Sequence, residues 1–343
     1  MLARFIGALA LSAGLLAACA PVVQKPHAGA VHFPGKPAGP HFDGDALVSF
    51  DGARLGLQMW PAKGEAKAVL AGLHGMNDYS SGYRTLAPYL AENGVTVYAI
   101  DQRGFGRSPN PGVWPGEDLM IADAAALEQA VRAAHSGLPF AFAGESMGGA
   151  VAIRAAAEGR IKPDRLILIA PAVWGWKNMP QAYRVALWLA AHTRPSQIVT
   201  PPKNLKIVAS DNNKMLWENW KDPLFLKRTR VDAVYGLVGL MQRASDSVAK
   251  APPNTLYLYG AKDQIIPPKA TFKAAAQLPK TVRTIYYPKG YHMLTRDLQG
   301  AVVWSDILAF IDDPAAPPPS GLGAIPAAKR LTAKGVKTAQ GNP

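Results

Sequence analysis

Short apolar runs alternate with longer stretches of helical periodicity through most of this chain. The runs with strand character span residues 68–73, 95–100, 140–143, 165–170, 255–259 and 281–287. The helical stretches span residues 83–92, 117–135, 147–158, 268–277 and 301–311. Continuous apolar strands separated by helices are buried on both faces. The alternation therefore predicts an α/β fold with a mostly parallel, doubly wound sheet.

Two segments depart from this alternation. Residues 46–50 and 54–60 are predicted to form a hairpin, because Asp51-Gly52 supply a tight turn between them. Residues 174–250 are irregular, aromatic and basic, and they contain five of the eight tryptophans. This stretch is predicted to be an insertion and not a further strand–helix unit.

A glycine-flanked serine lies between one predicted strand and the next helix, in the sequence Gly144-Glu145-Ser146-Met147-Gly148-Gly149. Glycines on both sides let the chain make a sharp turn that lifts the serine hydroxyl above the sheet edge. The alternative is a small-residue turn that only packs closely. Because candidate partners follow in the expected order, we predict that Ser146 is a nucleophile.

A serine hydroxyl needs a general base, and the base needs an acid that holds its tautomer. Asp263 and His292 follow the last two predicted strands, so the chain order is Ser, Asp, His, as this architecture requires. The rival acid is Asp101, which ends an earlier strand in a turn where a carboxylate can simply cap backbone amides. Weaker candidates for the base are His74, His135 and His192.

The oxyanion that develops in acyl transfer needs N–H donors placed in advance. We predict that the Met147 amide is one donor, because it follows the nucleophile at a helix N-terminus. The second donor is expected from the segment Leu73-His74-Gly75-Met76-Asn77, with the Met76 amide preferred and Asn77 as the alternative. His74 is then a loop-shaping residue.

Five segments together resemble the α/β-hydrolase superfamily and, within it, the monoacylglycerol lipase and lysophospholipase group. They are residues 74–77 (His-Gly-Met-Asn), 101–108 (Asp-Gln-Arg-Gly-Phe-Gly-Arg-Ser), 144–149, 260–263 (Gly-Ala-Lys-Asp) and 290–292 (Gly-Tyr-His). The resemblance implies an α/β-hydrolase fold and a catalytic triad of Ser146, Asp263 and His292, with Met76 and Met147 supplying the oxyanion amides. Members of the group commonly have histidine where this chain has Glu145, so the electrostatics beside the nucleophile differ here.

By the same resemblance, residues 174–250 form a helical cap over the active site. The expected substrate contacts are cap tryptophans that line an apolar tunnel for an acyl chain: Trp174, Trp176, Trp217 and Trp220. The alternative is that these rings make the core of the cap itself. The cap carries 12 Lys or Arg against five Asp or Glu. This excess favours an anionic membrane or a phosphate head group as partner, or else a solvated basic face.

The two ends of the chain are predicted to lie outside a folded domain at 45–313. Residues 1–18 have the charged start and apolar middle of a secretory signal, and Leu16-Ala17-Ala18-Cys19 resembles a bacterial lipobox. Cys19 is then lipidated; the alternative is an ordinary signal peptide that ends near a cysteine. Residues 19–44 are predicted to be a flexible spacer and 314–343 a disordered basic tail. The expected location is the cell envelope, as a lipid-anchored protein that faces the periplasm or the surface.

Composition excludes several classes of protein. The 343 residues are 49% hydrophobic and 18% charged, which excludes a mainly disordered or coiled-coil chain. The net charge of +13 comes without any nucleic-acid reading module, so no nucleic-acid partner is expected. One cysteine excludes an intrachain disulfide and a cysteine-cluster metal site. No metal or organic cofactor is implied, because a nucleophile, a base and oxyanion amides suffice for acyl transfer.

Three hypotheses follow for the function. The leading one is a membrane-tethered serine ester hydrolase that acts through an acyl-enzyme on monoacylglycerols or lysophospholipids. The second is a broad carboxylesterase for short-chain or aryl esters, and amide or thioester hydrolysis also fits the fold. The third, from another class, is a noncatalytic lipid-binding lipoprotein of the envelope.

Overall fold

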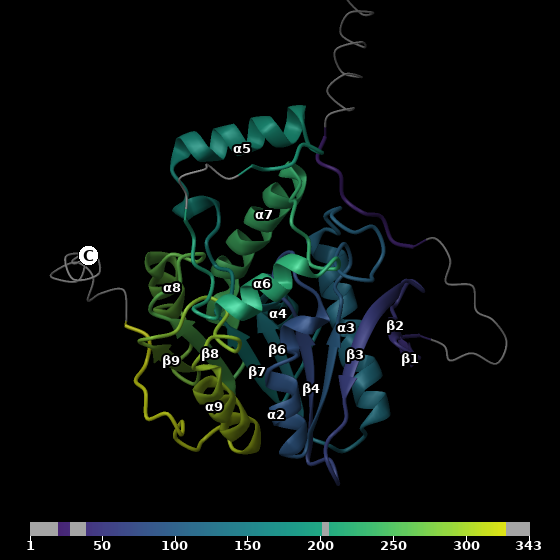
Figure 1. The fold of residues 1–343 in the computed structure, drawn as a ribbon, viewed down its shortest axis with the longest axis vertical. Coiled ribbons are helices and arrows are strands. Elements are labelled where there is room, and N and C mark those ends of the chain that lie inside the picture. Colours follow the sequence, from purple (N-terminus) through teal and green to yellow (C-terminus); the bar gives the residue numbers. More distant parts are fainter. Residues whose placement is uncertain (1–19, 28–38, 201–205, 327–343) are drawn as a thin grey trace, which may run out of the picture.

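A computed structural model describes residues 20–27, 39–200 and 206–326 of the chain (Figure 1). Its strands form a single sheet in the order β1-β2-β3-β5-β4-β6-β7-β8-β9. The strands are β1 (His41–Asp43), β2 (Ala46–Val48), β3 (Arg54–Trp60), β4 (Ala68–Leu73), β5 (Val95–Ile100), β6 (Phe140–Glu145), β7 (Arg165–Ile169), β8 (Thr255–Gly260) and β9 (Arg283–Tyr287). The helices are α2 (Leu86–Glu92), α3 (Glu117–Ala134), α4 (Met147–Ala157), α5 (Gln181–Thr193), α6 (Asn213–Lys221), α7 (Val231–Ser247), α8 (Pro268–Ala275) and α9 (Gly300–Asp312), with 3-10 turns η1 (Ser80–Tyr83), η2 (Trp176–Asn178) and η3 (Val248–Lys250).

Strands β4 to β9 pair in parallel, whereas β1, β2 and β3 are antiparallel at one edge. The predicted α/β class with a mostly parallel sheet is confirmed. The predicted hairpin is β2 and β3, paired from Val48 opposite Arg54. The predicted helix at 83–92 is shorter, because η1 takes up the chain before α2 begins at Leu86.

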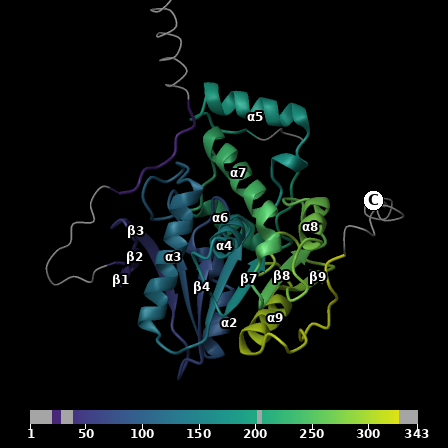
Figure 2. The same ribbon diagram turned by 180° about the vertical axis from the view of Figure 1, so that it is seen from behind.

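Helices cover both faces of the sheet, which explains why the central strands are apolar throughout. In β4, Val69, Ala71 and Leu73 join the core shared with α3 and α4, whereas Ala68 and Leu70 join the core shared with α2 and α9. All six residues of β4, β5, β6 and β8 are buried. Figures 1 and 2 show the two helical layers from opposite sides.

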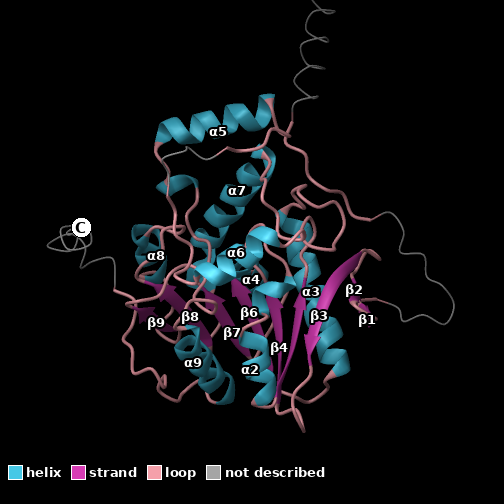
Figure 3. Ribbon diagram, viewed as in Figure 1, coloured by secondary structure: helices cyan, strands magenta, loops and turns pink. Residues whose placement is uncertain are grey.

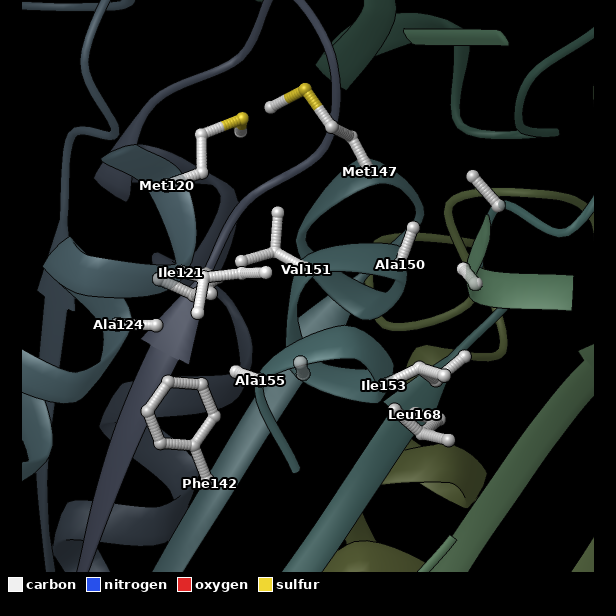
Figure 4. Packing of buried hydrophobic residues seen from close by; sticks show 14 of the residues in the cluster. Met120, Ile121, Ala124, Phe142, Met147, Ala150, Val151, Ile153, Ala155 and Leu168 are labelled. Carbon is white, nitrogen blue, oxygen red and sulfur yellow. The ribbon is translucent and has the colours of Figure 1, made fainter. Parts of the chain in front are cut away.

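Apolar side chains pack α4 against α3 and β6 in the core. Figure 4 shows Met147 and Val151 of α4 on the side where Met120 and Ile121 of α3 lie, with Phe142 of β6 nearby; all are at most 2% exposed. Burying large apolar side chains such as these stabilises a protein by roughly 1.5–3 kcal/mol each. The helix that begins directly after Ser146 is therefore rigidly placed.

The insertion at 174–250 contains η2, α5, α6, α7 and η3, and its helices lie over one end of the sheet (Figure 3). Three hydrogen bonds join it to the loop after β4. Leu226 N donates to Asn77 O (2.8 Å), the Asn77 amide donates to Thr229 Oγ1 (2.8 Å), and Tyr79 Oη donates to the Asp222 carboxylate (2.6 Å). The insertion is thus fastened directly onto the segment predicted to form the oxyanion hole.

The ends of the described chain differ from the predicted spacer and tail. Gln24 N donates to Trp114 O at 3.0 Å and His27 N donates to Asp51 at 2.7 Å, and β1 begins at His41. At the other end, Tyr286 N donates to Gly323 O at 2.9 Å, and the Ile325 side chain is buried in the core. Single anchoring residues hold these segments, so no hydrophobic periodicity reveals them. The structure thus places β1 within the predicted spacer, and hydrogen bonds to the folded domain within both the predicted spacer and the predicted tail.

The predicted signal peptide at 1–18 and Cys19 lie outside the described residues. Among the helices that the structure describes, none combines the length and the apolar character needed to cross a membrane.

Candidate active site

Ser146 lies at the turn between β6 and α4 in a strained conformation. Its φ is 51° and its ψ is −112°, which a residue with a side chain rarely adopts. Glycines make the turn possible: a Cβ on Gly148 would lie 2.4 Å from Leu73 O, and one on Gly144 would lie 2.4 Å from Gly148 O. The close approach of these backbones explains the glycines around the serine and presents its hydroxyl beyond the sheet.

The structure brings Ser146, His292 and Asp263 together from three loops. His292 Nε2 lies 2.9 Å from Ser146 Oγ, and His292 Nδ1 lies 2.8 Å from Asp263 Oδ2. The other oxygen of Asp263, Oδ1, accepts hydrogen bonds from Ile265 N (2.8 Å) and Ile266 N (2.9 Å). An ionised carboxylate only accepts hydrogen bonds, so Nδ1 carries the proton and Nε2 accepts from the serine hydroxyl.

The surroundings of His292 favour its protonated form. Burial lowers the pKa of this imidazole, but the charge and hydrogen bond of Asp263 outweigh burial, with a further contribution from Glu145, and the pKa is raised above the usual 6.5. A base whose cation is stabilised takes a proton more readily from the serine as the hydroxyl attacks. The arrangement suits proton removal from Ser146.

Two backbone amides are free to bind an oxyanion beside Ser146. A Cβ on Gly75 would lie 3.3 Å from the Ser146 Cβ, and Gly148 N donates to His74 O at 3.1 Å, so the loop after β4 adjoins the nucleophile. Within the described chain, neither the Met76 N–H nor the Met147 N–H donates to a protein acceptor. These are the two predicted donors. For the alternative, Asn77, the side-chain amide donates to Thr229 Oγ1 at 2.8 Å, whereas the backbone N–H has no protein acceptor among the described residues.

The rival residues have other partners. His74 is buried between Gln102 N (2.9 Å) and Gly75 O (2.7 Å), which fits a loop-shaping role. Asp101 accepts from Ser80 N and from Arg107 N, both at 2.9 Å. His135 Nε2 lies 2.8 Å from the Tyr98 hydroxyl, and His192 stacks on Trp188 in the cap. The described residues contain no group of three or more His, Cys, Asp or Glu arranged to hold a metal ion.

The four cap tryptophans predicted to contact substrate divide into two pairs. Trp174 and Trp176 are partly buried against the core, and Trp176 meets Tyr235 edge to face at 5.2 Å. Trp217 and Trp220 are 58% and 65% exposed, with lysines over their rings. An exposed ring does not line a closed tunnel, so the structure does not place the second pair as predicted. The reason is that α6 buries its Met215 and Asn219 side instead.

Space beside the predicted oxyanion amides is small. A hollow of about 10 Å³ lies there, bounded by Met76 and Asn77 on one side and by Leu226 and Thr229 of the cap on the other. This is about the space that one water molecule needs. Neither Ser146 nor His292 lines this hollow, so its size does not measure the space open to a substrate at the nucleophile.

Sequence reasoning singled out Glu145 but missed its partners. The Arg296 guanidinium lies between the carboxylates of Glu145 (3.0 Å) and Asp78 (2.6 Å). All three side chains are at most 4% exposed. Nothing local in the sequence signals this cluster, because its members are 151 and 218 residues away from Arg296.

The fold and the site together define a serine hydrolase with the α/β-hydrolase fold. Residues 64–299 match the model of the Hydrolase_4 family, described as serine aminopeptidase, S33, and the chain belongs to this family.

Several lipases are similar to this chain over most of its length. Human monoglyceride lipase is 26% identical over 268 residues, which cover 76% of this chain and 86% of the relative. A monoacylglycerol lipase from Mycolicibacterium smegmatis is 23% identical over 271 residues, covering 78% of this chain and 95% of the relative. Among solved structures, monoacylglycerol lipase from Paleococcus ferrophilus has a TM-score of 0.63 and 21% identity, covering 75% of this chain and 98% of its own. A soluble variant of Saccharomyces cerevisiae monoglyceride lipase has a TM-score of 0.64 and 20% identity, with 85% and 100% covered.

Proposed function

We propose that this protein is a membrane-associated serine ester hydrolase that cleaves single-chain lipid esters, namely monoacylglycerols or lysophospholipids. The observation that carries the proposal is the hydrogen-bonded chain from Ser146 Oγ through His292 to Asp263. The substrate class is supported by the monoglyceride lipases that the chain resembles along three quarters of its length.

The reaction has two halves that use the same residues. Ser146 Oγ attacks the ester carbonyl carbon while His292 Nε2 takes the hydroxyl proton, and the Met76 and Met147 amides stabilise the negative oxygen. The bond to the leaving alcohol breaks, and the alcohol takes the proton from His292. Water then attacks the acyl-enzyme with His292 again as base, which releases the fatty acid and restores Ser146.

The proposed lipid specificity predicts a dependence on acyl chain length. With Ser146-dependent hydrolysis measured across butyryl, octanoyl, lauroyl and palmitoyl monoacylglycerols, kcat/KM should rise with chain length, because each buried methylene contributes up to about 0.8 kcal/mol. The alternative, a carboxylesterase for short or aryl esters, predicts the opposite trend.

The same panel separates the alternatives. Good turnover of acetyl and butyryl esters together with poor turnover of long monoacyl lipids would assign the carboxylesterase function. An aminoacyl anilide tests the peptidase activity that the family description carries. Faster cleavage of that anilide than of any ester would overturn ester hydrolysis as the main reaction.

Association with a membrane through Cys19 and the cap is the second part of the proposal. The described chain begins at Ala20, and Val22 N donates to Asp232 in the first turn of α7 at 3.3 Å. A lipid on Cys19 would therefore be tethered on the side of the cap. The outermost helix there, α5 (Figure 1), exposes Tyr183, Val185, Trp188 and Leu189 among basic cap residues. Exposed apolar side chains with basic neighbours favour an anionic bilayer.

Replacing Cys19 by serine tests the anchor. The wild-type protein is expected to sediment with the membrane fraction, and most of the Cys19→Ser protein should stay in the supernatant, because the apolar anchor is lost. Hydrolysis of a soluble butyryl ester by both proteins controls for folding. Equal sedimentation of the two proteins would show that a lipid on Cys19 is not what holds the enzyme.

A further inference from the structure

A single buried guanidinium joins three of the four loops that carry the site. Arg296 Nη1 donates to Asp78 Oδ2 at 2.6 Å, and Nη2 donates to both oxygens of Glu145 at 3.0 Å. Its side chain is 1% exposed. Asp78 lies two residues after Met76, Glu145 directly precedes Ser146, and Arg296 follows His292 by four residues. The oxyanion loop, the nucleophile turn and the base loop therefore share one ionic cluster.

The base loop depends on side-chain contacts for its position. Residues 288–299, between β9 and α9, form no helix or strand. Besides the Arg296 contacts, the loop is held by the Asp297 carboxylate, which accepts from Ser210 Oγ (2.6 Å) and from Tyr291 N (2.7 Å). His292 of this loop contacts Ser146, whereas the Arg296 side chain bonds to both the nucleophile turn, at Glu145, and the oxyanion loop, at Asp78.

The geometry of the cluster requires an arginine. A planar guanidinium presents several N–H donors in fixed directions, so it can bind two carboxylates at once and hold the distance between them. A lysine keeps the charge but has a compact head that cannot reproduce this fork. Burial strengthens the requirement for an arginine that pairs both carboxylates, because an unpaired carboxylate in the interior costs several kcal/mol.

We propose that Arg296 is a positioning residue for catalysis: with Glu145 and Asp78, it fixes the Met76 amide and His292 relative to Ser146. This inference rests on the proposed function. Arg296 touches no reacting atom and acts through the two loops that it binds. Displacing an oxyanion donor or a base by about 1 Å can lower a rate by about 100-fold.

The cluster also acts on His292 electrostatically. The charged groups that face this imidazole are Asp263 from the loop after β8, Glu145 from the end of β6 and Arg296 from its own loop. Glu145 raises the pKa of His292 and Arg296 lowers it. Removing the Glu145 charge lowers that pKa, so the unprotonated base persists to lower pH and the acid limb of kcat/KM moves to lower pH.

Three variants separate geometry from charge: Arg296→Lys, Glu145→Gln and, as a matched control, Arg103→Lys. Arg103 is equally buried and binds Asp51 and Asp123, away from the catalytic loops. With a soluble butyryl ester, Arg296→Lys is expected to lower kcat about 10- to 100-fold with KM changed by less than about twofold, because the loops are displaced but the charge stays. Glu145→Gln is expected to lower kcat and to move the acid limb to lower pH. Arg103→Lys should lower the melting temperature without changing kcat per folded molecule.

The outcomes distinguish this inference from the proposed function. If Arg296→Lys keeps the wild-type kcat, or loses no more than the Arg103→Lys control, Arg296 is not a positioning residue. If Arg296→Lys does not fold, Glu145→Gln decides, and an unmoved acid limb with unchanged kcat overturns the inference. Absence of Ser146-dependent ester turnover in the wild-type protein would overturn the proposed function instead.

Discussion

Replacing Ser146 by alanine is expected to lower kcat for ester hydrolysis by about 10⁶-fold, which corresponds to about 8 kcal/mol of transition-state stabilisation. The reason is that no acyl-enzyme can form without the hydroxyl that His292 contacts at 2.9 Å. The residual rate comes from substrate binding and the oxyanion amides alone. Alanine keeps the Cβ and removes only the hydroxyl, so the strain at positive φ is unchanged and folding is not expected to suffer.

Labelling with a fluorophosphonate probe tests the reactivity of the Ser146 hydroxyl without the need to choose a substrate. The wild-type protein should be labelled and the Ser146→Ala protein should not. Ser245 on α7 provides the control, because it is 7% exposed against 8% for Ser146 and lies outside the triad. Labelling that survives in Ser146→Ala, or that is lost in Ser245→Ala, would remove Ser146 from its central role. A wild-type protein without labelling or turnover would favour the noncatalytic lipoprotein.

Replacing Asp263 by asparagine is expected to lower kcat by about 10⁴-fold through the tautomer of His292. Ile265 N and Ile266 N both donate to Oδ1, so an asparagine would keep its carbonyl oxygen there and turn its NH₂ group toward His292. That group donates to Nδ1, which forces the proton onto Nε2. An imidazole that carries its proton on Nε2 cannot accept the hydroxyl proton of Ser146.

The pH profile gives a second readout for Asp263→Asn. Because the charge of Asp263 raises the pKa of His292 in the wild-type protein, the residual activity should have its acid limb at lower pH. Asp101→Asn is the matched control, since Asp101 is also buried and was the rival acid. This variant should lose stability but keep its triad. The assignment of the acid would be reversed if Asp101→Asn abolished turnover while Asp263→Asn remained active.

The sequence predicted the sheet and the position of the triad residues because both depend on local patterns. A buried parallel strand must be apolar along its length, and a serine at a strand-to-helix turn needs neighbouring glycines, whatever lies elsewhere in the fold. Ser146, Asp263 and His292 follow β6, β8 and β9, and they meet because the carboxyl ends of parallel strands lie at one edge of the sheet.

The contacts that were missed depend on tertiary packing. Arg296 lies in a loop without periodicity, and its two carboxylates come from distant parts of the chain, the loop after β4 and the end of β6. In α6, Trp217 and Trp220 form the more apolar stripe, yet Met215 and Asn219 are buried because the helix docks through Asn219 onto Arg84. The contact between Asn219 and Arg84 joins elements far apart in the chain, so the local sequence could not predict it.

The bonds between residues 222–229 and the loop after β4 have a practical consequence for protein engineering. Transplanting the cap from another hydrolase, to exchange one acyl preference for another, would also replace the cap residues that hydrogen-bond to the loop carrying the Met76 amide. Chimeric enzymes made at the ends of the insertion should therefore lose turnover on every ester alike. Chimeras that retain the native 222–229 segment would change selectivity alone.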